Sequence, residues 1–237
     1  MRMGLRVIFF VCLAWMASGC LDASSDSFFV FSSNYDFAES QHGWLGDFAD
    51  YPEGDSIAFE LAFDYGNLPV NLGEDRKALM LSGNNLNGDL FMFVKRRLSG
   101  FVPNTDYTLV FDLELASTAP TGSTGIDGYP GEGVYVKVGA VGTEPRKVLT
   151  AGSYVMNIDK GNQGTDGADM ITVGNIAVSE FTNAYTIISR TNAQETIPFV
   201  VQSNSNGEIW LIVGVDSSYK GATTVYFTRL DMVFSSH

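Results

Sequence analysis

Hydrophobic and polar residues alternate along most of this chain with a period of two. The stretch Tyr107–Leu115 shows it most clearly: every second residue from Tyr107 is apolar, and the residues between are mostly polar. Such alternation places apolar side chains on one face of a strand and polar side chains on the other. It predicts an antiparallel sheet with one face in water.

Further stretches read as strands, and Gly, Asn, Asp and Pro turns separate them. They are Ser56–Phe63, Ala78–Leu81, Asp89–Leu98, Val134–Val141, Tyr154–Ile158, Thr172–Ile176, Thr186–Ser189, Ile197–Gln202, Ile209–Val215 and Thr224–Phe234. Ile209–Val215 is apolar throughout, which predicts a central strand covered on both faces. No internal repeat divides the chain. We therefore expect an all-β fold, a jelly-roll-like antiparallel β-sandwich of two sheets, in a single domain over residues 28–237.

The first twenty residues break this alternation. Arg2 and Arg6 precede the apolar run Val7–Met16, and small residues then lead to Cys20. This order is typical of a secretory signal peptide. The apolar run is also too short to span a bilayer as a helix, which takes about 20 residues. We expect residues 1–19 to be removed.

The end of this segment, Ala17-Ser-Gly-Cys20, resembles a bacterial lipobox. The resemblance implies that Cys20 carries a lipid, that residues 20–27 form a tether, and that the protein is anchored in the bacterial cell envelope. Leu21 stands where Asp resembles an inner-membrane retention signal of enteric bacteria, so the outer membrane is favoured. The alternative is an ordinary signal peptide followed by a chance cysteine.

Acidic residues outnumber basic ones, with 27 Asp and Glu against 14 Lys and Arg. Removing Arg2 and Arg6 leaves 12 basic residues and a net charge of −15. A nucleic-acid partner is therefore excluded, because phosphate binding needs clustered Lys and Arg. The lipid, rather than the protein surface, would have to supply membrane attachment.

Cysteine and histidine are too scarce for several kinds of site. Cys12 and Cys20 are the only cysteines, so the domain can form no disulfide and no cysteine metal site. The only histidines are His42 and His237, which makes a zinc site or a Ser-His-Asp triad improbable. The sequence also lacks a phosphate-binding loop, a dinucleotide-binding fingerprint and a serine-hydrolase motif.

Three segments resemble jelly-roll carbohydrate-binding modules. Tyr35–Trp44 resembles their opening motif, Leu98–Asp112 their central hairpin, and Tyr226–Phe234 their closing strand with its single Asp. The chain is also similar to a group of bacterial secreted proteins that share its GDFADYP and NIDKGNQ stretches. The resemblance implies a jelly-roll fold, a glycan ligand and a structural Ca²⁺ held by Glu39 and Asp231. The alternative for Asp231 is an ion pair with Arg229 or with a neighbouring strand.

Sugar binding needs aromatic rings beside acids and amides, because a ring stacks on the apolar face of a pyranose while polar groups bind its hydroxyls. One stretch, from Trp44 to Tyr51, holds this mixture, and two further aromatic residues lie in loops. The predicted ligand-binding residues are Trp44, Asp47, Asp50, Tyr51, Tyr129 and Tyr219. The alternative for Trp44 is burial in the core, as is usual for large aromatic side chains.

Three functions are compatible with these features. The leading hypothesis is a non-catalytic lipoprotein that binds glycan or another extracellular ligand. A polysaccharide-degrading hydrolase or lyase is the second, and the candidate carboxylates for a hydrolase are Asp112, Glu114, Asp127 and Glu132. A structural or adhesive envelope protein is the third. The basic run Lys95–Arg97 either lines a groove for acidic sugars or offsets nearby acids.

Overall fold

The computed structural model describes residues 29–73, 75–179 and 184–236. The predicted signal peptide, the lipidation site Cys20 and the tether all lie outside the described residues. Within the described ranges, no helix is long and apolar enough to cross a membrane.

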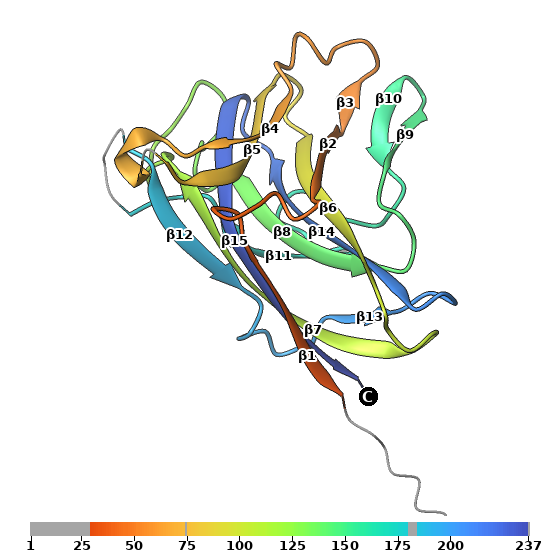
Figure 1. The fold of residues 1–237 in the computed structure, drawn as a ribbon. Coiled ribbons are helices and arrows are strands. Elements are labelled where there is room, and N and C mark those ends of the chain that lie inside the picture. Colours follow the sequence, from red (N-terminus) through yellow and green to blue (C-terminus); the bar gives the residue numbers. More distant parts are fainter. Residues whose placement is uncertain (1–28, 74, 180–183, 237) are drawn as a thin grey trace, which may run out of the picture.

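The described chain is built almost entirely from β-strands (Figure 1). The strands are β1 (Val30–Asp36), β2 (Leu45–Ala49), β3 (Tyr51–Pro52), β4 (Ala62–Asn67), β5 (Lys77–Asn85), β6 (Leu90–Ser99), β7 (Asp106–Ser117), β8 (Val134–Val141), β9 (Lys147–Thr150), β10 (Ser153–Met156), β11 (Met170–Asn175), β12 (Thr186–Thr191), β13 (Val200–Gln202), β14 (Glu208–Ser217) and β15 (Gly221–Ser236). A single 3-10 turn, Val70–Leu72, follows β4.

Two antiparallel sheets form the sandwich. Sheet A has seven strands in the order β12-β7-β15-β5-β4, with β1 beside the second half of β15 and β13 beside the first half of β7. Sheet B has five strands in the order β11-β8-β14-β6-β2, and a third, three-stranded sheet has the order β3-β10-β9. The predicted fold class, a two-sheet antiparallel β-sandwich of jelly-roll type, is thus confirmed.

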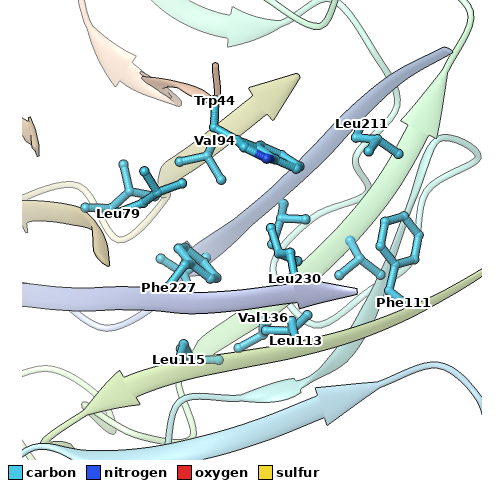
Figure 2. Packing of buried hydrophobic residues seen from close by; sticks show 14 of the residues in the cluster. Trp44, Leu79, Val94, Phe111, Leu113, Leu115, Val136, Leu211, Phe227 and Leu230 are labelled. Carbon is cyan, nitrogen blue, oxygen red and sulfur yellow. The ribbon is translucent and has the colours of Figure 1, made fainter. Parts of the chain in front are cut away.

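The inner faces of sheets A and B share one hydrophobic core. Phe111, Leu113 and Leu115 of β7 point inward, as the alternation in this strand predicts, and they face Leu211 of sheet B (Figure 2). Trp44, which precedes β2, is fully buried in the same core. Burial of apolar area on this scale supplies the main driving force for folding.

The apolar strand β14 lies in the middle of sheet B, between β6 and β8. Its outward-facing Ile212 packs in a second cluster with Phe91, Phe93 and Met170. The sequence-based prediction that this strand is covered on both faces is therefore confirmed.

Two predictions about local structure are wrong. The stretch Ser56–Phe63 was predicted as a strand, but residues 53–60 form turns and β4 begins at Ala62. The buried Phe59 explains the apolar signal, because it anchors a turn to the core. Strands β1 and β2 were missed, since serine, glycine and aspartate interrupt their alternation.

The outer faces of the two large sheets differ in accessibility. Met156 of β10 and Ile158 of the loop that follows pack against the apolar cluster outside sheet B, so this segment covers part of that face. On sheet A, a small cluster around Leu68, Ala78 and Ala116 covers one end only. Among the described residues, no second apolar cluster covers the rest of the outer face of sheet A.

Candidate ligand-binding site

Two rows of polar residues cross four strands on the open face of sheet A, where β12, β7, β15 and β1 are hydrogen-bonded neighbours (Figure 1). Backbone register aligns Ser189, Glu114, Arg229 and Asp36 in one row, and Thr191, Asp112, Asp231 and Asn34 in the other. The residues that alternate with them, such as Leu113 and Leu230, are buried in the core. Both rows therefore point outward, because neighbouring residues of a strand face opposite sides.

A hollow of about 320 Å³ lies over these rows. Its polar lining consists of Asp112, Glu114, Ser189, Arg190, Thr191, Arg229 and Asp231. Carboxylates, hydroxyls and two arginines thus line the same surface depression, and the guanidinium of Arg190 donates hydrogen bonds to the carbonyl oxygens of Asn175 and Ser189.

Asp231 is held in a fixed orientation within this hollow. Its Oδ2 is 2.6 Å from Nη2 of Arg229, and its Oδ1 accepts a 2.8 Å hydrogen bond from Nδ2 of Asn34. The hydrogen bond and charge of Asp231 raise the pKa of Arg229 above its usual value. The guanidinium therefore stays charged and available to accepting oxygens of a ligand.

Asp112 lies directly opposite Asp231 in the β7–β15 ladder. Like charges placed opposite each other destabilise a sheet. Asp112 is exposed, and none of the described residues donates a hydrogen bond to its carboxylate. The charge of Asp231 is offset by Arg229, whereas that of Asp112 has no such partner among the described residues.

An aromatic pair lies further along the same face. Tyr226 precedes Arg229 on β15 and contacts Tyr185, with ring centroids 5.1 Å apart at an angle of 89°. Burial, together with the neighbouring Tyr226 hydroxyl, raises the pKa of Tyr185. Partly exposed rings beside a polar hollow suit a ligand with both hydroxyls and C–H faces.

The structure corrects the predicted roles of Trp44 and Tyr51. Trp44 is 0% exposed and packs edge-on against Tyr35 and Phe37, so the alternative of a core residue is confirmed. Tyr51 is 3% exposed and packs against Phe59. Neither ring is available for stacking on a sugar.

Asp47 and Asp50 are on the covered side of the molecule. Asp47 pairs with Nζ of Lys147 at 2.8 Å, and Asp50 pairs with Nζ of Lys160 at 2.9 Å. Lys147 also donates a hydrogen bond to the hydroxyl of Tyr51, so this predicted group does come together. These side chains contact Lys147 and Lys160, however, rather than forming an open binding surface.

Tyr129 and Tyr219 belong to two loops that contact each other. Asp127 pairs with Lys220 at 2.7 Å and links the loops. Tyr129 is half exposed, whereas the Tyr219 ring packs so closely on Gly125 and Gly221 that a Cβ at either position would overlap it. Of the six predicted ligand-binding residues, Tyr129 presents the most accessible ring.

The basic run on β6 is explained by local ion pairs. Lys95 pairs with Glu144 at 2.7 Å, and Arg97 pairs with Glu208 at 3.1 Å. Arg96 faces the other side, with its guanidinium 4.6 Å from the ring centroid of Tyr35. The alternative that these residues offset nearby acids is thus confirmed.

The residues around Asp231 do not fit a ready calcium site. Both of its oxygens already have partners, and no group of three or more His, Cys, Asp or Glu within the described ranges is placed to hold a metal. Glu39 is exposed in the turn after β1. Ca²⁺ takes six to eight oxygens, so the calcium ion stays a prediction that would require Asp231 to release Arg229.

Comparisons with known proteins add a structural likeness only, since no family profile and no curated protein matches the sequence. The chain is similar to TmCBM61 in complex with beta-1,4-galactotriose, at 9% identity and a TM-score of 0.36, over 83% of this chain and 92% of that one. It is similar to the CBM22-1 xylan-binding domain of Paenibacillus barcinonensis Xyn10C, at 10% identity and a TM-score of 0.36, over 84% and 91%. It is also similar to the K1 cleaved adhesin domain of Lys-gingipain from Porphyromonas gingivalis W83, at 10% identity and a TM-score of 0.38, over 85% and 97%. These values carry no argument about the ligand of this chain.

Sequence reasoning identified the three carboxylates of the hollow, Asp112, Glu114 and Asp231, and the alternative of an ion pair between Asp231 and Arg229 is confirmed. Ser189, Arg190 and Thr191 gave no signal of their own. Their significance depends on strand register, which joins β12, β7 and β15 across long stretches of sequence.

Proposed function

We propose that this chain is a glycan-binding β-sandwich anchored to the bacterial cell envelope by a lipid on Cys20, with its binding site in the hollow on sheet A. The observation that carries the proposal is Asp112 placed opposite Asp231 on an open sheet face. A sheet that needed only to be soluble would not align two acids, because the arrangement costs stability.

The hollow has the donors and acceptors that a sugar requires. The carboxylates of Asp112 and Glu114 accept hydrogen bonds from hydroxyls, and the guanidinium of Arg229 donates to ring and hydroxyl oxygens. Three carboxylates against the two guanidinium groups of Arg190 and Arg229 leave the lining negative by one charge. This charge favours neutral or amino sugars and disfavours uronic acids.

The described chain begins at some distance from the hollow. The backbone N–H of Phe29 donates a 2.9 Å hydrogen bond to Oγ of Ser236, so the described chain starts at the β1–β15 end of sheet A. Asn34 is five residues further along, which corresponds to roughly 17 Å of extended strand. The proposed anchor on Cys20 precedes Phe29 in the sequence, so it would join the domain at this end.

The test is affinity electrophoresis of the purified protein in gels that contain neutral, amino or acidic polysaccharides. We expect neutral or amino glycans to retard the protein. Asp112→Asn, which keeps the shape but removes the charge, should weaken binding about tenfold or more, as loss of a charge-assisted hydrogen bond does.

Asp127→Asn is the matched control, because it makes the same change at the loop pair of Tyr129 and Tyr219. If Asp127→Asn abolishes retardation and Asp112→Asn does not, the site lies in the loops instead. If no polysaccharide in a broad panel retards the wild type, glycan binding is rejected, and cross-linking to envelope proteins would then favour a structural or adhesive role.

One observation favours a polysaccharide hydrolase as the second candidate. Paired residues of an antiparallel ladder have Cα atoms about 4.5–5.5 Å apart, and retaining glycosidases place two carboxyl groups about 5–5.5 Å apart. Asp112 and Asp231 meet the first condition. Release of reducing ends by the wild type, lost in Asp112→Asn and Asp231→Asn, would establish hydrolysis, whereas retardation without release establishes binding alone.

A further inference from the structure

A buried ionic group lies under the loop that covers sheet B. Nζ of Lys160, in that loop, is 2.6 Å from Oδ2 of Asp216 on β14 and 2.9 Å from Oδ2 of Asp50, which separates β2 from β3. The three side chains are 8%, 0% and 10% exposed, respectively. An amine and two carboxylates are thus packed together almost out of reach of water.

Neighbouring groups hold this arrangement in place. Nζ of Lys137 donates hydrogen bonds to the carbonyl oxygens of Lys160 and Thr165, at 2.6 and 2.8 Å, and so fixes the loop backbone. The backbone N–H of Gln163 donates to Oδ2 of Asp216 at 3.0 Å. The ring of Phe91 lies 5.1 Å from Nζ of Lys160 and provides an apolar wall.

An ion pair alone leaves this group incompletely satisfied. Oδ1 of Asp216 is buried and accepts no hydrogen bond from any described residue. A buried acceptor without a partner destabilises the fold, and a buried ion pair recovers its desolvation cost only when every polar atom is satisfied.

We propose that Lys160 and Asp216 condense into an intramolecular amide, with a bond between Nζ of Lys160 and Cγ of Asp216. The contact at 2.6 Å, the low exposure to water and the second carboxylate beside the amine are the conditions that such a condensation needs. This inference is independent of glycan binding.

The step balances without any other reactant. The Lys160 ammonium carries three protons, and Asp50 accepts the first, which frees the nitrogen lone pair to attack Cγ of Asp216. The C–N bond forms and the bond from Cγ to Oδ1 breaks. Two of the three protons leave with Oδ1 as water, one stays on the amide nitrogen, and Asp50 ends as the carboxylate it was at the start.

The electrostatics are consistent with this role of Asp50. Burial, which outweighs the attraction of Lys160, raises the pKa of Asp50 and makes it a better proton acceptor. Burial alone would lower the pKa of Lys160, but Asp216 and Asp50 offset this and hold the pKa above its ordinary value. The charged pair is therefore the starting state, and condensation removes both charges from the interior.

The amide removes the unsatisfied hydrogen-bond acceptor that the ion pair leaves in the interior. The unpartnered atom, Oδ1 of Asp216, is the one that leaves. The remaining oxygen keeps its hydrogen bond from Gln163, and the new amide N–H faces Asp50. The link would join positions 56 residues apart in a domain that has no cysteine for a disulfide.

Mass spectrometry of the full chain tests the proposal. We expect the wild type to be lighter than its calculated mass by one water molecule, and a digest to contain the Lys160 peptide joined to the Asp216 peptide. Trypsin should also fail to cleave after Lys160. Asp216→Asn should lose ammonia instead of water, whereas Lys160→Arg and Asp50→Asn should show no loss.

The same N-terminal processing affects all variants, so it cancels in their comparison. Lys95 and Glu144 are the internal control, since they form a similarly short but partly exposed ion pair and should yield only unlinked peptides. The wild-type digest is decisive even if a variant fails to fold. A full-mass wild type with a free Lys160 peptide overturns the proposal, as does an equal amount of cross-link between Lys95 and Glu144.

Discussion

The outer faces of the two sheets each carry an ion pair, but the two pairs differ in their exposure to solvent. On sheet A, Arg229 and Asp231 form an ion pair whose side chains are 52% and 20% exposed. Outside sheet B, Lys160 and Asp216 form a pair of the same length at 8% and 0%. The difference comes from the segment at and after β10, which covers part of sheet B and has no counterpart over the hollow among residues 29–73, 75–179 and 184–236.

The comparison shows that burial determines whether a charged side chain needs a partner within the protein. Under the loop, each charge must find a partner within the protein, because an unpaired buried charge is very costly. On the open face, water solvates the charges, so Asp112 can be tolerated without a partner among the described residues. This contrast is why we propose ligand binding at sheet A and internal chemistry on the covered side.

Removing one lysine from the covered face should have the largest effect on stability. We expect Lys160→Met to lower the free energy of unfolding by about 3–5 kcal/mol, since it leaves Asp216 and Asp50 buried without their cation. For a domain of this size the melting temperature should fall by roughly 10 °C or more.

Arg229→Met is the matched change on the open face, and thermal melts of the two variants sharpen the comparison. Its melting temperature should stay close to that of the wild type, because exposed ion pairs contribute little. Equal losses in the two variants would contradict the contrast between the faces.

A change in pH should have an intermediate effect on the free energy of unfolding. Burial, and then the charge of Asp50, raise the pKa of Asp89 to about 6. The folded state thus holds this proton more tightly than the unfolded chain, so the stability from Asp89 is complete below about pH 4 and is lost as pH rises through 6.

Because Asp89 is partly exposed, solvent screening should reduce this contribution to about 1 kcal/mol. Chemical denaturation of the wild type and Asp89→Asn from pH 4 to 7 would measure it. The difference between the two proteins should shrink or reverse as pH falls, since protonated Asp89 resembles the amide. A difference that is constant across this range contradicts the assignment.

The smallest effect should come from chelation. Asp231 already has Arg229 and Asn34 as partners, so we expect EDTA to leave the melting temperature unchanged. A decrease on adding EDTA that disappears in Asp231→Ala would instead establish the calcium ion that the resemblance implies.

Sequence patterns predicted the sandwich well where one strand face is apolar. Strands such as β7, β8 and β14 bury every second residue or are buried on both sides, so their hydrophobicity reports their structure directly. The hydrophobic pattern did not predict strand β1, because only one edge of this strand pairs with the sheet and Ser33 occupies one of its inward positions.

The candidate site was less predictable for a physical reason. Its eight aligned residues come from four strands, and hydrogen-bond register rather than sequence distance brings them together. Trp44 was predicted to bind a ligand because its side chain is aromatic. It lies in the core instead, since large rings gain most from burial.

The pairing of β15 determines when sheet A can form during synthesis of the chain. β15 borders β7 along one side, while β5 and then β1 share its other side, so the final residues join the beginning of the domain to its middle. A nascent chain that still lacks Gly221–Ser236 cannot assemble sheet A. Folding of sheet A must therefore wait until β15 has been synthesised, and a premature stop before Gly221 would leave an unfolded chain rather than a shortened domain.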